Sequence, residues 1–165
     1  MYTVDASVWV NGFDQREAGH ARSRQLLELL RTRALPLIEP TLVLAEVAGA
    51  ISRTRQDPAQ AQAFATTLGQ LPNVTVLPLD AALGQRALGL AAQHGLRGAD
   101  AVYAAVAQHA GCTLISLDHE QLTRLADIIS VQTPAAALAA LTPPPEEAST
   151  SSPSCYRCSD LLLES

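Results

Sequence analysis

The chain has 165 residues, of which 48% are hydrophobic and 16% charged, so a wholly disordered chain is excluded and one folded domain is expected. Its formal net charge is −5 and its basic residues are all arginine, which excludes a protein held to nucleic acid by bulk positive charge alone. Its three cysteines are too few for a disulfide framework. No signal peptide and no apolar run of about eighteen residues is evident, so we expect a cytoplasmic protein without a membrane segment.

The composition changes after Thr142, where three consecutive prolines and a serine-rich segment begin. Such segments bury too little apolar area to offset the entropy of ordering. We therefore predict a folded domain over residues 1–142 and a flexible tail over residues 143–165. Four acids and one arginine give the tail a charge of −3. Its Cys155 and Cys158 do not supply the four ligands of a structural zinc site.

Within residues 1–142, short apolar segments alternate with longer helical ones. In chain order we predict a strand at 2–4, a helix at 14–33, a strand at 36–39, helices at 41–53 and 57–71, a strand at 74–77, helices at 80–94 and 99–110, a strand at 113–117, a helix from about 119, a strand at 128–131 and a helix from 133. Asp14 and Glu17 are predicted to cap the first helix reciprocally. Alternating strands and helices predict an α/β fold whose mostly parallel sheet is covered on both faces.

Two of the predicted strands are followed directly by aspartate, namely Asp5 and Asp118. In a parallel sheet both would project from the same edge, where ligands bind in folds of this class. Each also has a simpler interpretation as the N-cap of the next helix. For Asp118 that alternative is strong, because the sequence from Asp118 to Gln121 fits a capping box.

Two further acids are placed in apolar helices. Glu46 lies in a helix that is apolar around its circumference, which is typical of a buried helix, and a buried carboxylate is costly unless paired, protonated or metal-bound. Asp100 begins another apolar helix, where interaction with the helix dipole is the simpler explanation. Four carboxylates converging on one cleft would raise one another's pKa, and a hard divalent cation such as Mg²⁺ or Mn²⁺ would relieve that repulsion. This arrangement favours phosphodiester hydrolysis.

Four motifs in this order resemble those of PIN-domain ribonucleases, and most closely the VapC-type toxins of bacterial toxin–antitoxin pairs. They are Val4-Asp5-Ala6-Ser7, Leu44-Ala45-Glu46-Val47, Leu96-Arg97-Gly98-Ala99-Asp100-Ala101 and Ile115-Ser116-Leu117-Asp118. The resemblance covers nearly all of residues 1–142. It implies a three-layer α/β/α sandwich with a short, mostly parallel central sheet, and a metal-dependent endoribonuclease that cuts single-stranded RNA.

The resemblance also implies roles for individual residues. Asp5, Glu46, Asp100 and Asp118 take the catalytic and Mg²⁺- or Mn²⁺-binding positions, and Ser7 supports Asp5. Leu117 stands where the family more often has a polar residue, which leaves open whether Asp118 binds metal directly. The expected partners are RNA, a cognate antitoxin that lays a helix against the leucines of residues 14–33, and a second copy of the chain.

Arg97 and His119 are candidate contacts for RNA phosphates. For His119 a surface position in the first turn of a helix is the simpler explanation. The early arginines, which include Arg53 and Arg55, are explained most simply as a solvated helix face, and the alternative is a surface that tracks phosphates beside the acidic cleft. A non-catalytic RNA-binding or partner-binding module on the same fold is the alternative function. A phosphatase-type hydrolase is disfavoured, because it needs an acid two residues after its nucleophilic aspartate and Ser7 stands there.

Overall fold

The computed structural model describes residues 1–142, and the predicted tail, with its two cysteines, lies outside the described residues. A five-stranded sheet with the order β3-β2-β1-β4-β5 forms the centre, and every pair of neighbouring strands is parallel. Its strands are β1 (Tyr2–Val4), β2 (Leu37–Pro40), β3 (Val74–Leu77), β4 (Thr113–Ile115) and β5 (Val131–Gln132). The α/β class and the parallel sheet predicted from the sequence are confirmed.

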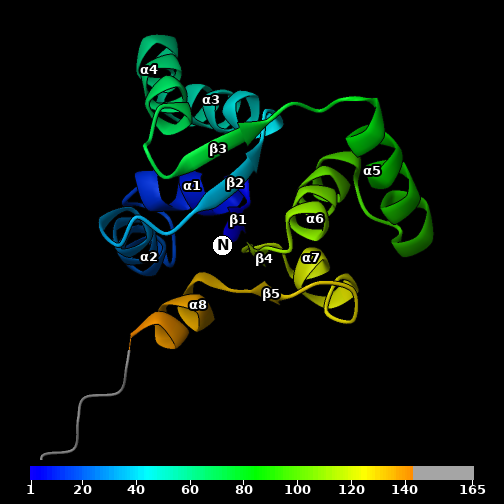
Figure 1. Ribbon diagram of the computed structural model, residues 1–165. Helices are drawn as coiled ribbons and strands as arrows, with labels where there is room; N and C mark the ends of the chain where they lie inside the picture. Colours follow the sequence, from blue (N-terminus) through cyan, green and yellow to red (C-terminus); the bar gives the residue numbers. More distant parts are fainter. Residues whose placement is uncertain (143–165) are drawn as a thin grey trace, which may run out of the picture.

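Helices cover both faces of this sheet, with α1 and α2 on one side and α5 and α6 on the other (Figure 1). The helices are α1 (Ala6–Phe13), α2 (His20–Thr32), α3 (Leu42–Arg55), α4 (Pro58–Gly69), α5 (Ala81–His94), α6 (Gly98–Ala110), α7 (His119–Arg124) and α8 (Pro134–Leu141). The three layers predicted from the resemblance are therefore present. No helix within residues 1–142 is both long and apolar enough to cross a bilayer.

The prediction of a single helix over residues 14–33 is wrong in two respects. An unpredicted helix, α1, precedes it, and α2 begins only at His20 after a loop in which Gly19 has a φ of 82°. Asp14 is the C-cap of α1 rather than an N-cap. Its carboxylate is bound by Arg16 and Arg55 at 2.8 and 3.1 Å, and these contacts, first among them the hydrogen bond from Arg16, hold its pKa below the usual range.

Two strands also differ from their predicted bounds: β4 is shorter than predicted, and β5 is displaced along the chain. β4 ends at Ile115 instead of residue 117, and β5 starts at Val131 instead of residue 128. The register explains the second difference, because Leu114 and Ile115 pair with Val131 and Gln132 while the preceding residues form a turn. The predicted helices after residue 40 are recovered within a few residues, including the ends of α5 and α6 at the left-handed Gly95 and Gly111.

The core lies where α6 crosses the sheet. Every residue of α6 from Ala101 to Ala107 is buried, and the helix contacts β1, β2 and β4. Small alanines on this helix allow it to approach the strands closely, and burial of this apolar surface stabilises the layered arrangement. Cys112 is 4% exposed and belongs to the same core. This packing fixes the start of α6, and hence Asp100, next to the end of β1.

Candidate active site

A cleft of about 770 Å³ opens beside the carboxyl end of β1. Three of the four predicted acids line it: Asp5 from the β1–α1 junction, Glu46 from α3 and Asp100 from the first turn of α6. The cleft is lined by Asp5, Ala6, Ser7, Val10, Asn11, Glu17, Ala45, Glu46, Ala50, Arg53, Asp100 and Leu117. Segments that are far apart in sequence thus bring three carboxylates to one opening, at the sheet edge where the parallel topology predicts a ligand site.

Asp5 is the most buried of these acids, with 7% of its surface exposed. Its Oδ1 accepts a hydrogen bond from the backbone N–H of Ser7 at 2.7 Å, which caps α1. Its Oδ2 accepts one from Nε2 of Gln121 at 2.8 Å. The cap predicted as the simpler interpretation of Asp5 is therefore present, and the same carboxylate also lines the cleft.

Glu46 lies on the side of α3 that faces the cleft and is half-buried. The predicted all-round burial of its helix is wrong, because Ala45 beside it is exposed. The hydroxyl of Tyr103 donates a hydrogen bond of 2.6 Å to Glu46 Oε2. Desolvation by burial, and then the charges of Asp5 and Asp100, raise the pKa of Glu46 above its ordinary value, while the Tyr103 hydrogen bond opposes that rise.

Asp100 stands in the first turn of α6 and accepts a hydrogen bond of 2.8 Å on Oδ1 from Gln121 Nε2. Burial raises the pKa of Asp100, the charges of Asp118 and Asp5 raise it further, and the Gln121 hydrogen bond and Arg97 lower it. Glu46 and Asp100 thus have similar electrostatic surroundings. Each is partly desolvated beside other carboxylates, so each has a raised pKa, and a positive charge in the cleft would stabilise its ionised form.

Asp118 occupies a different position from the other three acids, because it does not line the cleft. Its Oδ1 accepts hydrogen bonds from the backbone N–H groups of Glu120 and Gln121 at 2.7 and 3.3 Å, so it is the N-cap of α7. Its own N–H donates to Ser116 Oγ at 2.9 Å. The capping alternative recognised in the sequence is thus the geometry observed.

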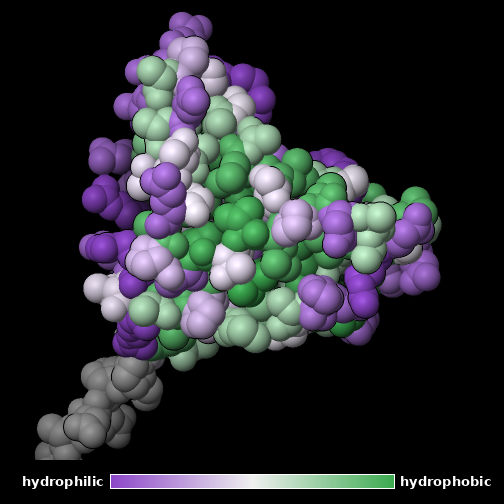
Figure 2. Space-filling view, turned by 45° about the horizontal axis from the view of Figure 1, so that its top comes forward, coloured by the Kyte–Doolittle hydropathy of each residue, from purple (hydrophilic) through white to green (hydrophobic). Residues whose placement is uncertain are grey.

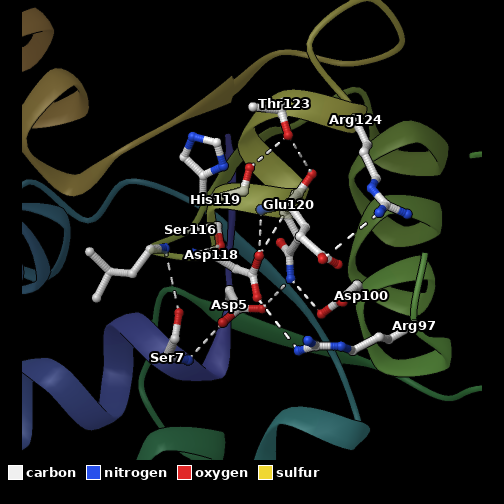
Figure 3. A network of polar contacts seen from close by, with 12 residues as sticks. Asp5, Ser7, Arg97, Asp100, Ser116, Asp118, His119, Glu120, Thr123 and Arg124 are labelled. Carbon is white, nitrogen blue, oxygen red and sulfur yellow. Dashed lines mark hydrogen bonds and ion pairs between the residues drawn. The ribbon is translucent and has the colours of Figure 1, made fainter. Parts of the chain in front are cut away.

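Figure 3 shows Asp5, Asp100, Asp118 and Arg97 gathered near the start of α7. Arg97 Nη1 lies 3.9 Å from Asp118 Oδ2, and the arginine side chain is 72% exposed, so its guanidinium remains accessible to an anion. His119 is exposed and does not line the cleft. Ser7 lines the cleft, and its Oγ accepts a long hydrogen bond of 3.5 Å from the Leu117 N–H.

Three residues of this region were not singled out from the sequence, and a fourth, Arg53, was considered only as one of the early arginines. Gln121 and Tyr103 bind the cleft carboxylates, Arg53 lines the cleft, and Glu39 is a fully buried acid whose Oε1 accepts the Val4 N–H at 2.9 Å. Burial raises the pKa of Glu39 strongly. Only Arg53 carried a usable signal, since it follows Glu46 by seven residues and so lies on the same side of α3. The sequence indicates Gln121 only as the last residue of a capping box, whereas its side chain binds Asp5 and Asp100 instead of the Asp118 N–H.

The donor chemistry of the cleft suits a hard divalent cation. Mg²⁺ and Mn²⁺ prefer carboxylate oxygens and bind through few protein ligands, keeping several waters. Asp5, Glu46 and Asp100 provide such oxygens around one opening. Across residues 1–142, however, no three acids, histidines or cysteines are already close enough to form a ready-made metal site. The residues therefore fit a cation by chemical type.

Comparison with known proteins agrees with this description of the fold. The family model for the PIN domain matches residues 2–128, and no curated protein sequence matches the chain. Among solved structures, the chain is similar to VapC20 of Mycobacterium tuberculosis, a toxin that cleaves the sarcin–ricin loop. The identity is 20% and the TM-score 0.64, over 78% of this chain and 96% of that one.

Two toxin–antitoxin complexes share the fold as well. VapBC2 from Rickettsia felis, bound to a DNA fragment from its promoter, is 16% identical, with a TM-score of 0.59 over 80% of this chain and 97% of that one. A toxin–antitoxin complex from Klebsiella pneumoniae is 20% identical, with a TM-score of 0.59 over 81% and 98%. At these identities the likeness is one of fold, and the cleft described above lies within the matched residues.

Proposed function

The chain belongs to the PIN domain family, and from this premise we propose that it is a metal-dependent endoribonuclease and the toxin of a toxin–antitoxin pair. The observation that carries the proposal is the meeting of Asp5, Glu46 and Asp100 at one cleft beside the end of β1. The M. tuberculosis toxin, which has a similar fold and cleaves the sarcin–ricin loop, supports the choice of RNA as substrate.

In this proposal the three cleft acids hold Mg²⁺ or Mn²⁺. When bound, such a cation supplies activation of water and stabilisation of charge on the oxygens of the phosphodiester. Asp5 is held by Ser7 and Gln121, and Glu46 by Tyr103, so the acids are oriented before the cation arrives. The raised pKa values of Glu46 and Asp100 favour binding of a cation once the pH is high enough for these two acids to be ionised.

Two arginine side chains in or near the cleft could contact the RNA backbone. Arg53 lines the cleft on the side of α3, and the exposed Arg97 stands near its acidic end. Arginine forks suit phosphate oxygens. We therefore assign Arg53, together with the Arg97 predicted from the sequence, to contacts with phosphates that flank the cut bond. His119 is a weaker candidate, since it lies outside the cleft lining.

Incubation of the purified full chain with structured and single-stranded RNAs tests this function. We expect cleavage in the presence of Mg²⁺ or Mn²⁺, its loss on addition of EDTA, and its recovery when excess Mn²⁺ is restored. Cleavage that persists in EDTA would overturn the metal-dependent mechanism. RNA binding without cleavage under every metal condition would instead identify the alternative, a non-catalytic RNA-binding module on the same fold.

A groove between α1, α2 and α4 supports an antitoxin as partner. Its volume is about 250 Å³ and it is lined by Trp9, Gly12, Arg24, Leu27, Glu28, Arg31, Phe64 and Leu71. Apolar side chains flanked by charged ones suit the apolar stripe of an amphipathic helix. Leu27, one of the leucines that predicted a partner surface, lies in this groove, whereas Leu26 and Leu30 are buried in the core.

Exposed apolar residues support the second proposed partner, another copy of the chain. Leu79, Leu88 and Leu117 are 47%, 61% and 40% exposed. Figure 2 shows hydrophobic residues gathered across the middle of one face, with hydrophilic residues around them. Apolar surface of this kind commonly marks a protein interface. We also propose that the protein is found in the cytoplasm, where it would meet both RNA and an antitoxin.

Tyr103→Phe tests the hydrogen bond that orients Glu46. The Tyr103 hydroxyl lowers the pKa of Glu46, so its removal raises that pKa further and protonates Glu46 at higher pH. We expect the acid limb of the pH–rate profile for RNA cleavage to move to higher pH, with a loss of severalfold on the acid side and little change at alkaline pH. Tyr2→Phe is the control, since Tyr2 lies outside the cleft. An unchanged profile in Tyr103→Phe would contradict the role given to the hydroxyl.

A further inference from the structure

One side-chain amide joins two acids of the cleft. Gln121 Nε2 donates to Asp5 Oδ2 and to Asp100 Oδ1, each at 2.8 Å. Asp5 follows β1 and Asp100 lies on α6, so the amide links two layers of the fold. An amide NH₂ has two hydrogens, and here each is directed to a different carboxylate. Hydrogen bonds to charged acceptors are the stronger kind.

Gln121 makes these bonds from behind the cleft. Its side chain is fully buried, at 0% exposure, and it does not line the opening that Asp5, Glu46 and Asp100 share. It therefore leaves the cleft side of the two carboxylates free. A residue in this location supports ligands without occupying their binding position, which is the arrangement typical of groups that orient metal-binding side chains.

The carbonyl end of the same side chain shows that this orientation is costly. Gln121 Oε1 is buried and has no hydrogen-bond partner among the described residues. Turning the amide over would place that oxygen against Asp5 Oδ2 and Asp100 Oδ1 and remove the donor that each of these two oxygens has from Gln121. A buried polar atom without a partner costs free energy, so the two bonds to Asp5 and Asp100 outweigh this cost.

The start of α7 determines where Gln121 lies. Asp118 accepts the backbone N–H groups of Glu120 and Gln121, and Ser116 accepts the N–H of Asp118. These bonds fix the first turn of α7 at the end of β4. The predicted fourth acid is thereby connected to the cleft through Gln121, although it does not line the cleft itself.

We propose that Gln121 is a positioning residue that holds Asp5 and Asp100 in the orientation needed to bind the divalent cation. This inference rests on the proposed function in so far as it assumes that these acids bind metal. Its effect is on the affinity for the cation. Loss of a group that orients metal ligands typically weakens metal binding by about 10- to 100-fold.

Isothermal titration of the full chain with Mn²⁺ alone tests the inference without any measurement of activity. Gln121→Met keeps a long, unbranched side chain in the buried position but removes both N–H donors. We expect its Kd for Mn²⁺ to rise at least about tenfold over the wild-type value, with a correspondingly smaller increase in Tm on addition of Mn²⁺. Thr123→Val is the matched control on α7, because the Thr123 hydroxyl donates only to backbone carbonyls of that helix.

Gln121→Asn provides a second variant in case the methionine variant does not fold. It keeps the amide but is one methylene shorter, so it cannot reach both carboxylates, and its Kd should also rise. Wild-type affinity in either folded variant would overturn the inference, and tighter binding would do so as well, since it would mean that the amide competes with the cation. Absence of Mn²⁺ binding by the wild type would instead refute the proposed metal-dependent function, so the two failures are distinguishable.

Discussion

Replacement of Asp5 by Asn is expected to reduce RNA cleavage by about 10²- to 10³-fold, the scale of loss when a group that stabilises transition-state charge is removed. Asp5 is the most buried acid of the cleft and is held on both oxygens, by Ser7 and Gln121. Asn retains one oxygen that can cap α1, but it lacks the negative charge that attracts a cation. The fold should survive because the charge that is lost repels Glu46 and Asp100.

Initial rates of cleavage with saturating Mn²⁺ measure this effect, and circular dichroism and Tm verify that the variant is folded. Asp57→Asn is the matched control, since Asp57 caps α4 through the Gln60 N–H at 2.9 Å and does not line the cleft. Both variants replace a capping aspartate by the same residue, so a loss specific to Asp5→Asn separates catalysis from capping. Full activity in Asp5→Asn would refute the proposed site.

The sheet and most helices could be predicted because their signals are local. Apolar runs such as Thr113–Ile115 and glycines such as Gly95 determine strands and helix ends within a few residues. The N-terminal third was less predictable. Asp14 fits an N-cap by sequence, but its carboxylate is bound by Arg55, which lies 41 residues away. No local pattern contains a contact of that range, and the local pattern alone did not separate α1 from α2.

The candidate site shows the same division between local and long-range information. The acids after β1 and at the start of α6 could be placed at one edge because the topology follows from the order of elements. The partners that orient them, Tyr103 and Gln121, could not, because each meets its carboxylate only through tertiary packing. Sequence patterns thus indicated which residues are charged and near the edge, while the structure identifies the residues that fix their orientation.

The distribution of formal charge along the chain is compatible with binding of RNA by the folded domain. Residues 1–142 carry a formal charge of −2, since the tail accounts for −3 of the total of −5. Asp5, Glu46 and Asp100, the three predicted acids that line the cleft, carry more negative charge than this net value, so the rest of the domain is slightly basic. A cation bound among those acids would leave a domain without the net negative charge that opposes binding of RNA.

Substitution of Asp118 is expected to give the second large effect on cleavage. Two variants at this position separate a role in capping α7 from a role in binding the cation. If Asp118 acts by capping α7 and placing Gln121, Asp118→Asn should stay within about threefold of wild type, because Asn retains a capping oxygen. Asp118→Ala removes the acceptor of the Glu120 and Gln121 N–H groups. We expect it to weaken Mn²⁺ binding and cleavage by about 10- to 100-fold, as does loss of other groups that orient metal ligands.

Titration with Mn²⁺ and initial cleavage rates measure both variants. Asp80→Ala is the control, because it removes the cap of α5, a bond of 2.8 Å to the Leu83 N–H, at a site outside the cleft. It should lower Tm without changing the Kd for Mn²⁺. Equal, large losses in Asp118→Asn and Asp118→Ala would show that the negative charge of Asp118 itself is required, and would assign Asp118 to the cation rather than to α7.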